Sequence, residues 1–184
     1  MQYRLMGLVL VLMVAQACSS VVLNREPLGE NFPRVQGQSL AGEAYSLPDD
    51  FAGQPVVLLI GYKQRSQFDL DRWILGLVQL GTPVRIIEVP TIKGIFPGLF
   101  ANQIDNGMRK GIPKEDWGSV VTVYDEAAPI VAFTGNENGS NGRVLLLDEK
   151  GKVLWFADRG YSAGQVKELD AKVRKMSISE PSAK

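Results

Sequence analysis

The run Pro55-Val56-Val57-Leu58-Leu59-Ile60-Gly61-Tyr62 contains no charged side chain. A continuous apolar run of this length is typical of a central strand that is covered on both faces. Residues 66–78 follow with capping-box spacing and then an apolar helical stripe, which predicts a helix ending near Gly81. Residues 82–89 have the pattern of a second strand. Strand, helix and strand at this spacing predict a right-handed parallel crossover, and therefore an α/β fold.

The flanking sequence predicts the other elements of one domain. Before the central run, residues 38–47 have the pattern of a hairpin. After it, residues 96–108 predict an amphipathic helix whose apolar side chains fall four apart. The remaining elements are expected to be, in chain order, a short strand at 120–124, a short helical segment at 127–133, a Gly/Asn-rich loop at 134–142, a hairpin at 143–157 and a last helix at 163–176.

The composition removes several classes of function. The chain of 184 residues has 20 basic and 20 acidic side chains, so it lacks the positive charge that nucleic-acid binding needs. It has no histidine and one cysteine, which excludes a cysteine pair and removes the commonest metal ligand and general base. The sequence therefore predicts no cofactor, no metal site and no enzymatic activity.

The N-terminus is typical of a secretion signal. One positive charge precedes an apolar run from Leu5 to Ala15, which is too short to span a bilayer. The stretch Val14-Ala15-Gln16-Ala17-Cys18 resembles the lipobox of bacterial lipoproteins, although those usually carry Leu where Ala15 stands. The resemblance implies that Cys18 becomes the first mature residue and carries acyl chains that anchor the protein. An ordinary secretion signal is the alternative.

These features predict four segments: a signal peptide at 1–17, a tether at 18–31, a domain at 32–177 and a disordered tail at 178–184. The lipobox resemblance implies a bacterial cell envelope protein that faces the periplasm. Ser19 after the lipidated cysteine favours the outer membrane by the sorting rule of that family.

The order of elements resembles the thioredoxin-like superfamily, which implies a central mixed sheet with an N-terminal hairpin and flanking helices. The resemblance covers most of residues 33–176. It places Arg65-Ser66-Gln67-Phe68 where active members carry Cys-x-x-Cys, and Gly142 near the position of the family's cis-proline. Because thiol exchange needs a thiolate, this chain cannot perform thioredoxin chemistry.

Short pieces also resemble the thioredoxin-like assembly factors of the mitochondrial F-type ATP synthase and their bacterial relatives. The pieces are Phe32-Pro33 before Ser39-Leu40-Ala41-Gly42, Leu47-Pro48, Val56 to Leu59, Gln67 ahead of Trp73, and Val144 to Trp155 with Gly151. This resemblance implies a membrane-associated helper, without redox activity, that holds a client protein.

Candidate binding residues occur in three places. Lys63, Arg65 and Gln67 lie where a strand is expected to meet a helix N-terminus, a place that can receive an anion. Trp73 is expected in the core by its helical phase, although it could line that site instead. Phe96 and Phe100 belong to the apolar stripe, which forms either core or a client-binding surface.

We therefore expect a non-catalytic envelope lipoprotein that binds a protein partner, as an assembly factor or chaperone of a membrane complex. Two alternatives belong to other classes: a module that binds a small anionic ligand at the first helix N-terminus, and a cysteine-independent enzyme.

Overall fold

The computed structural model describes residues 21–93 and 97–179, and for residues 97–100 it describes the backbone alone. The predicted lipidation site Cys18 and the candidate Phe96 lie outside these residues, as does the side chain of Phe100. In the described residues no helix is both long and apolar enough to cross a membrane.

The central sheet has four strands in the order β4-β3-β6-β7. They are β3 (Val56–Gly61), β4 (Arg85–Pro90), β6 (Arg143–Leu147) and β7 (Val153–Ala157). Strand β3 is buried along its whole length and pairs parallel to β4 on one side and antiparallel to β6 on the other. The continuous apolar run thus forms an inner strand, and the sheet is mixed as predicted.

A smaller sheet contains the N-terminal hairpin in the order β2-β1-β5. Its strands are β1 (Val35–Ser39), β2 (Ala44–Leu47) and β5 (Val121–Thr122). An isolated bridge between Thr91 and Val123 brings the end of β5 beside the end of β4. The predicted hairpin is confirmed, and the short third strand connects it to the main sheet.

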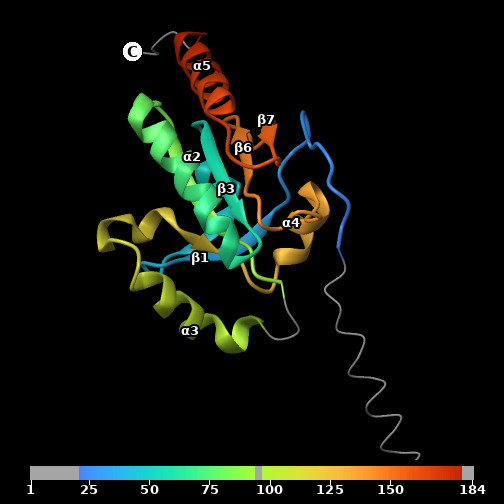
Figure 1. Cartoon of the computed structure of the whole chain (residues 1–184), viewed down its shortest axis with the longest axis vertical. Coiled ribbons are helices and arrows are strands. Elements are labelled where there is room, and N and C mark those ends of the chain that lie inside the picture. Colours follow the sequence, from blue (N-terminus) through green and yellow to red (C-terminus); the bar gives the residue numbers. More distant parts are fainter. Residues whose placement is uncertain (1–20, 94–96, 180–184) are drawn as a thin grey trace, which may run out of the picture.

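Two helices, α2 (Gln67–Leu80) and α5 (Ala163–Ser179), cover one face of the main sheet (Figure 1). They meet at Gly76, where an added Cβ would lie 3.1 Å from Val166 Cγ1. Helix α2 ends at Gly81, whose φ of 58° allows the left-handed turn that its position predicts. The buried residues of this layer are Val57, Leu59, Leu70, Trp73, Leu77, Val144, Leu146, Trp155, Ala157, Val166, Leu169 and Val173.

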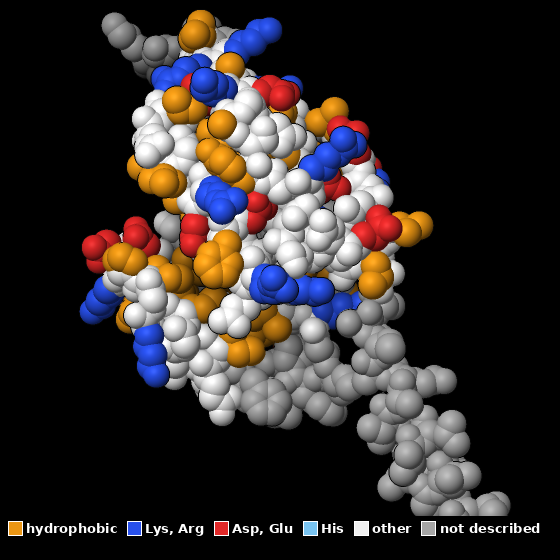
Figure 2. Space-filling model, viewed as in Figure 1, with side chains coloured by type: hydrophobic (Ala, Val, Ile, Leu, Met, Phe, Trp, Pro, Cys, Tyr) orange, Lys and Arg blue, Asp and Glu red, His pale blue; other side chains and the backbone are white. Residues whose placement is uncertain are grey.

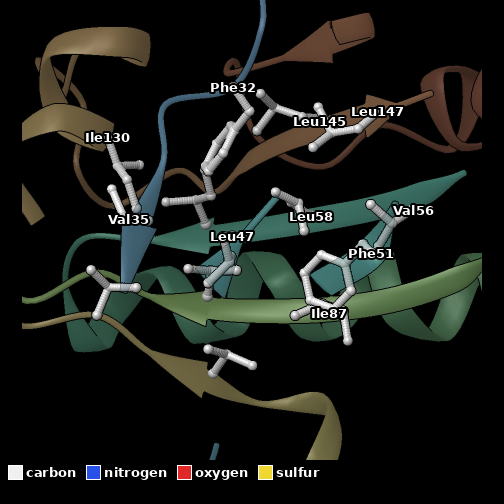
Figure 3. Packing of buried hydrophobic residues seen from close by; sticks show 14 of the residues in the cluster. Phe32, Val35, Leu47, Phe51, Val56, Leu58, Ile87, Ile130, Leu145 and Leu147 are labelled. Atoms are coloured by element: carbon white, nitrogen blue, oxygen red, sulfur yellow. The ribbon is translucent and has the colours of Figure 1, made fainter. Parts of the chain in front are cut away.

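The opposite face packs against the hairpin and helix α4 (Ala127–Thr134). Figure 3 shows Phe32 and Leu47 reaching toward the side chains of the central strands. The alternation of side chains along β3 explains the two layers, since Val56, Leu58 and Ile60 lie here while their neighbours face α2. The described residues also form three short 3-10 helices: η1 (Asp49–Phe51), η2 (Gln64–Ser66) and η3 (Lys114–Ser119).

Helix α3 (Pro97–Arg109) makes two polar contacts with the rest of the domain through its described side chains. The Tyr124 hydroxyl donates to Asp105 Oδ1 at 2.5 Å, and Arg109 Nε donates to the carbonyl of Leu40 at 2.8 Å. Of the predicted apolar stripe, Ile104 and Met108 are half-buried and belong to neither buried cluster of the described residues. The described part of the stripe is therefore only partly covered.

Residues 22–31, which were predicted to be part of a free tether, pack against the domain in the structure. Val22 N–H donates to Asn136 Oδ1 at 2.7 Å, and Asn136 N–H donates to the Val22 carbonyl at 2.9 Å. Farther along, Gly29 and Glu30 exchange backbone hydrogen bonds with Val153. An extended segment held by backbone bonds needs no apolar periodicity, so its composition resembles that of a free chain.

The end of the domain also differs from the predicted boundary. Helix α5 continues to Ser179, whereas the domain was expected to end at residue 177.

Candidate functional site

The corner predicted to carry a binding site lies where β3 ends and α2 begins. Lys63 and Arg65 are exposed there, on either side of the first residue of η2. The aliphatic part of Lys63 lies against Gly139 of the α4–β6 loop, because a Cβ added at that glycine would be 3.1 Å from Lys63 Cε. Gln67 is half-buried at the start of α2. The three predicted residues therefore share one corner of the fold.

The backbone of this corner is already engaged in hydrogen bonds. Ser66 N–H donates to the Lys63 carbonyl at 2.9 Å, and Gln67 N–H donates to the Gln64 carbonyl. These bonds form the η2 turn and reduce the number of amides that an incoming anion would find at the helix start. The electrostatic attraction of Lys63 and Arg65 is further opposed by Asp69, which lies in the first turn of α2.

The predicted capping box at Ser66 and Asp69 does not form, which corrects the prediction. Ser66 has helical backbone angles and its hydroxyl donates to the Lys63 carbonyl at 2.7 Å. The Asp69 carboxylate instead accepts from Gly142 N–H at 2.8 Å and from Tyr161 N–H at 2.5 Å. Because η2 already supplies the helix start, the carboxylate is free to join α2 to two distant loops.

Gly142 explains why no proline occupies this position. A Cβ there would lie 2.1 Å from Leu70 Cδ2, and the N–H of Gly142 is the donor to Asp69. The ring of a proline would collide with Leu70, and a proline has no N–H to donate to Asp69. Gly142 and Asp69 thus form a hydrogen-bonded junction next to the Arg65-Ser66-Gln67-Phe68 stretch.

A buried carboxyl group lies beneath the same helix start. Glu88 of β4 is 6 % exposed, and burial raises its pKa to about 7, against an opposing hydrogen bond from the Gln67 side chain. Gln67 Nε2 also donates to Asp71 Oδ1 at 2.8 Å, and the negative charge of Asp71 raises the pKa of Glu88 further. Sequence reasoning missed Glu88, although a single charged residue inside the apolar strand at 86–89 was the available signal.

Arg143 at the start of β6 is a second residue that sequence reasoning missed. It is fully buried, and burial lowers its pKa. Its guanidinium donates to the carbonyls of Asn138 and Asn141 and to Asn24 Oδ1, all within 2.9 Å, and it lies 5.5 Å above the ring of Tyr62. Arg143 Nε has no hydrogen-bond partner among the described residues. Arg143 therefore fastens the α4–β6 loop and the N-terminal segment to the sheet.

Trp73 lies in the core, as its helical phase predicts. Its ring packs edge-to-face on Trp155 and on Tyr161, with centroid distances of 5.8 and 6.1 Å. Its indole Nε1 is buried and has no partner among the described residues. Trp73 therefore does not line the exposed corner of Lys63 and Arg65.

A hollow of about 680 Å³ lies between the N-terminal segment and the end of β7. Its lining residues are Asn24, Arg25, Glu26, Asn138, Asn141, Phe156, Ala157, Asp158, Arg159 and Gln165. The lining contains carboxylates and amides, but no Ser, Thr, Tyr, Cys or Lys that could act as a nucleophile. Among the described residues no group of three or more His, Cys, Asp or Glu side chains could hold a metal ion.

The outer face of α2 carries the largest exposed apolar side chains near the predicted site. Phe68 is 76 % exposed, Leu75 56 % and Val78 63 %. At 100° per residue these three fall within about 80° of one another around the helix, and they extend over about 15 Å. Figure 2 shows hydrophobic side chains gathered over this side of the molecule. The surface there is hollowed in the direction of α3 and η3. We call Phe68, Leu75 and Val78 the α2 row.

Comparisons with known proteins define the fold class. No family model matches this chain. No curated protein matches it either. Solved structures do match, and with the sheet order and flanking helices described above they show that this is a thioredoxin-like fold.

Three of the similar structures come from two groups. Yeast Sco1 with copper bound is 14 % identical, with a TM-score of 0.57, and the match covers 87 % of this chain and 98 % of that one. BsSco, a member of the Sco family of cytochrome c oxidase assembly proteins, is 12 % identical with a TM-score of 0.56, covering 85 % and 98 %. The exposed lipoprotein thioredoxin Etrx1 of Streptococcus pneumoniae is 13 % identical with a TM-score of 0.53, covering 76 % and 99 %. At these identities the likeness is one of fold.

Proposed function

We propose that this chain is a thioredoxin-like envelope lipoprotein without redox activity, anchored through Cys18, that binds a protein partner as an assembly factor or chaperone of a membrane complex. The observation that carries the proposal is the exposure of Arg65 and Phe68 at the start of α2, the two positions that the resemblance aligns with the cysteines of active thioredoxin-like proteins. A surface that elsewhere performs thiol exchange here presents a cation and an aromatic ring.

The α2 row extends this surface into a shape suited to a protein partner. Exposed aromatic and aliphatic side chains on one helix face leave water when a partner covers them, and a central aromatic often contributes much of the binding energy. Asp71 and Arg72 are exposed on the same helix and supply charges of both signs around the apolar side chains. A partner with a complementary apolar helix or strand edged by charges fits this pattern.

Two of the similar structures come from proteins whose described roles resemble the one proposed here. BsSco belongs to a family whose members are described as cytochrome c oxidase assembly proteins, and Etrx1 is described as an exposed lipoprotein. An assembly role and a lipid anchor thus both occur on this fold. The present chain lacks the cysteine pair, so we assign it a role that rests on binding alone. The proposed location is the periplasmic side of the bacterial envelope, with the outer membrane favoured.

Affinity capture from native envelopes tests the proposal. The lipidated, tagged protein is crosslinked in place and its partners are identified by mass spectrometry, beside a variant with Phe68→Ala and Leu75→Ala. Both side chains are largely exposed, so the variant is expected to fold normally, which circular dichroism checks. One membrane complex that is enriched with the wild type and lost with the variant supports the proposal. Equal recovery of every protein with both forms contradicts it.

Two alternatives have less support. An anion-binding module would use Lys63 and Arg65, but two amides of the turn are engaged and Asp69 lies in the first turn. Thermal shifts with carboxylates and phosphates test it through saturable stabilisation. A cysteine-independent enzyme would need converging catalytic groups, and the hollow at the end of β7 offers two carboxylates, the exposed Glu26 and the half-buried Asp158, without a hydroxyl, thiol or amine beside them.

A further inference from the structure

We propose that the N-terminal segment holds the domain directly against the lipid bilayer in one orientation, with the side chains of Val21 and Leu23 in the headgroup region. The inference rests on the proposed lipidation of Cys18. It adds an interaction surface, formed by Val21 and Leu23, and identifies the lipid bilayer as the partner of that surface. A free tether would instead let the domain turn in any direction.

The first described residues alternate between outward and inward positions. Val21 and Leu23 are 67 % and 74 % exposed, whereas Val22 and Asn24 between them are half-buried. This two-residue period is that of an extended chain lying on a surface. One side of the segment therefore contacts the domain, and the other presents two apolar side chains to the surroundings.

The inward side is fixed by a set of hydrogen bonds, which we call the clamp. Besides the two bonds between Val22 and Asn136, Asn24 N–H donates to Glu137 Oε2 at 2.7 Å and Glu137 N–H donates to Asn24 Oδ1 at 3.0 Å. The buried Arg143 donates to the same Asn24 oxygen at 2.8 Å. Five hydrogen bonds from three residues of the domain leave this segment little freedom to swing.

The clamp includes a close backbone contact that leaves no space for rearrangement. Gly135 has a φ of 72°, and a Cβ added to it would lie 2.2 Å from the carbonyl oxygen of Leu23. The α4–β6 loop thus accepts the segment because this position has no side chain.

The connection to the anchor is short. Four peptide steps separate Cys18 from Val22, so even a fully extended chain spans at most about 14 Å. Figure 1 shows that the described chain begins beside α4, on the side away from the C-terminal end of α5. An acylated Cys18 would therefore hold the α4 end of the domain within that distance of the membrane.

The exposed side chains identify the bilayer as the surface that covers them. Apolar side chains next to a lipid anchor leave water when they enter the interface, and the anchor has already brought them there. The next exposed residue, Arg25, pairs with Glu30 and lies over the ring of Phe133, so the contact with the bilayer rests on the two apolar side chains. A protein partner in the same place would have to enter the narrow space between domain and membrane.

Energy transfer from the domain to fluorescent lipids tests this orientation. In the lipidated protein on vesicles, a dye is placed at Ala132→Cys, exposed on α4, or at Ile178→Cys, 83 % exposed near the end of α5. Cys18 is blocked by its acyl chains, so labelling is specific. We expect strong transfer from position 132 and weak transfer from position 178. A third dye at Leu23→Cys should be quenched by brominated lipids.

Breaking the clamp provides the matched control. With Asn24→Ala and Asn136→Ala in addition, transfer from positions 132 and 178 should converge, because the longer free chain lets the domain rotate. Equal transfer from the two positions in the intact protein would overturn the inference, and so would a dye at position 23 that stays in water. A protein that does not float with vesicles, or whose Cys18 peptide is unmodified, would overturn the anchor of the proposed function as well.

Discussion

Glu88 gives a prediction whose size follows from its environment. Burial raises the pKa of this carboxyl from 4.5 to about 7, so the folded protein holds a proton that the unfolded chain has released between these pH values. The contribution of Glu88 to stability is therefore greatest below pH 4.5 and falls as pH rises toward 7. A difference of about 2.5 pH units corresponds to about 3 kcal/mol.

The Glu88→Gln substitution removes this titration and keeps the shape of the side chain. At pH 8 the variant should be more stable than the wild type by up to about 3 kcal/mol, and the difference should shrink toward zero at pH 5. Urea unfolding followed by tryptophan fluorescence measures it, since Trp73 and Trp155 lie in the core. Glu115→Gln, at an exposed position of η3, is the control and should change stability by less than about 0.5 kcal/mol.

The decisive quantity is the difference between the Glu88→Gln variant and the wild type at each pH, because the other carboxylates cancel in it. A difference that does not change between pH 5 and pH 8 would refute the reasoning. It would mean that the Glu88 carboxylate is charged in the folded protein throughout this range.

Two further substitutions test the junction at the start of α2. Asp69→Ala removes two charge-assisted hydrogen bonds to backbone N–H groups and should cost about 3 kcal/mol, lowering the Tm by roughly 6–12 °C, whereas the exposed Asp71→Ala should cost about 0.5 kcal/mol or less. Equal Tm values for these two variants would contradict the junction. Gly142→Ala should cost about 1–3 kcal/mol because its methyl group meets Leu70, while Gly107→Ala, in open space on α3, should gain about 0.5–1 kcal/mol in urea unfolding.

The fold was largely predictable because its main signals are local. The apolar run at 55–62, the helical stripe behind it and the Gly-centred hairpin at 143–157 each depend on side-chain periodicity, which the sequence displays directly. The thioredoxin-like order followed from these elements, and the solved structures agree with it.

The errors arose where distant segments meet. The capping box at Ser66 and Asp69 has the right spacing, but the backbone took a 3-10 turn and the carboxylate found partners 73 and 92 residues away. The N-terminal segment resembled a tether because hydrogen bonds to the α4–β6 loop leave no periodic pattern. Local rules cannot anticipate such long-range polar contacts.

The spatial grouping of the candidate residues was predictable, whereas the buried groups around them were not. The strand-to-helix corner placed Lys63, Arg65 and Gln67 together, as the general rule for α/β folds indicates. The buried Glu88 beneath them comes from a neighbouring strand, and its unusual pKa depends on burial that only the packed structure supplies. Phe68 belonged to the quoted motif, but its exposure became evident only once α2 was packed against the sheet.

Site-specific photocrosslinking from position 68 tests the central claim most directly. A photoreactive phenylalanine analogue replaces Phe68 in the lipidated protein inside living cells, and a second protein carries it at Lys167, an exposed position of α5. The proposed partner-binding function predicts one discrete adduct from position 68 that is absent from position 167. Identical adduct patterns from the two positions, or no adduct from position 68, would contradict it.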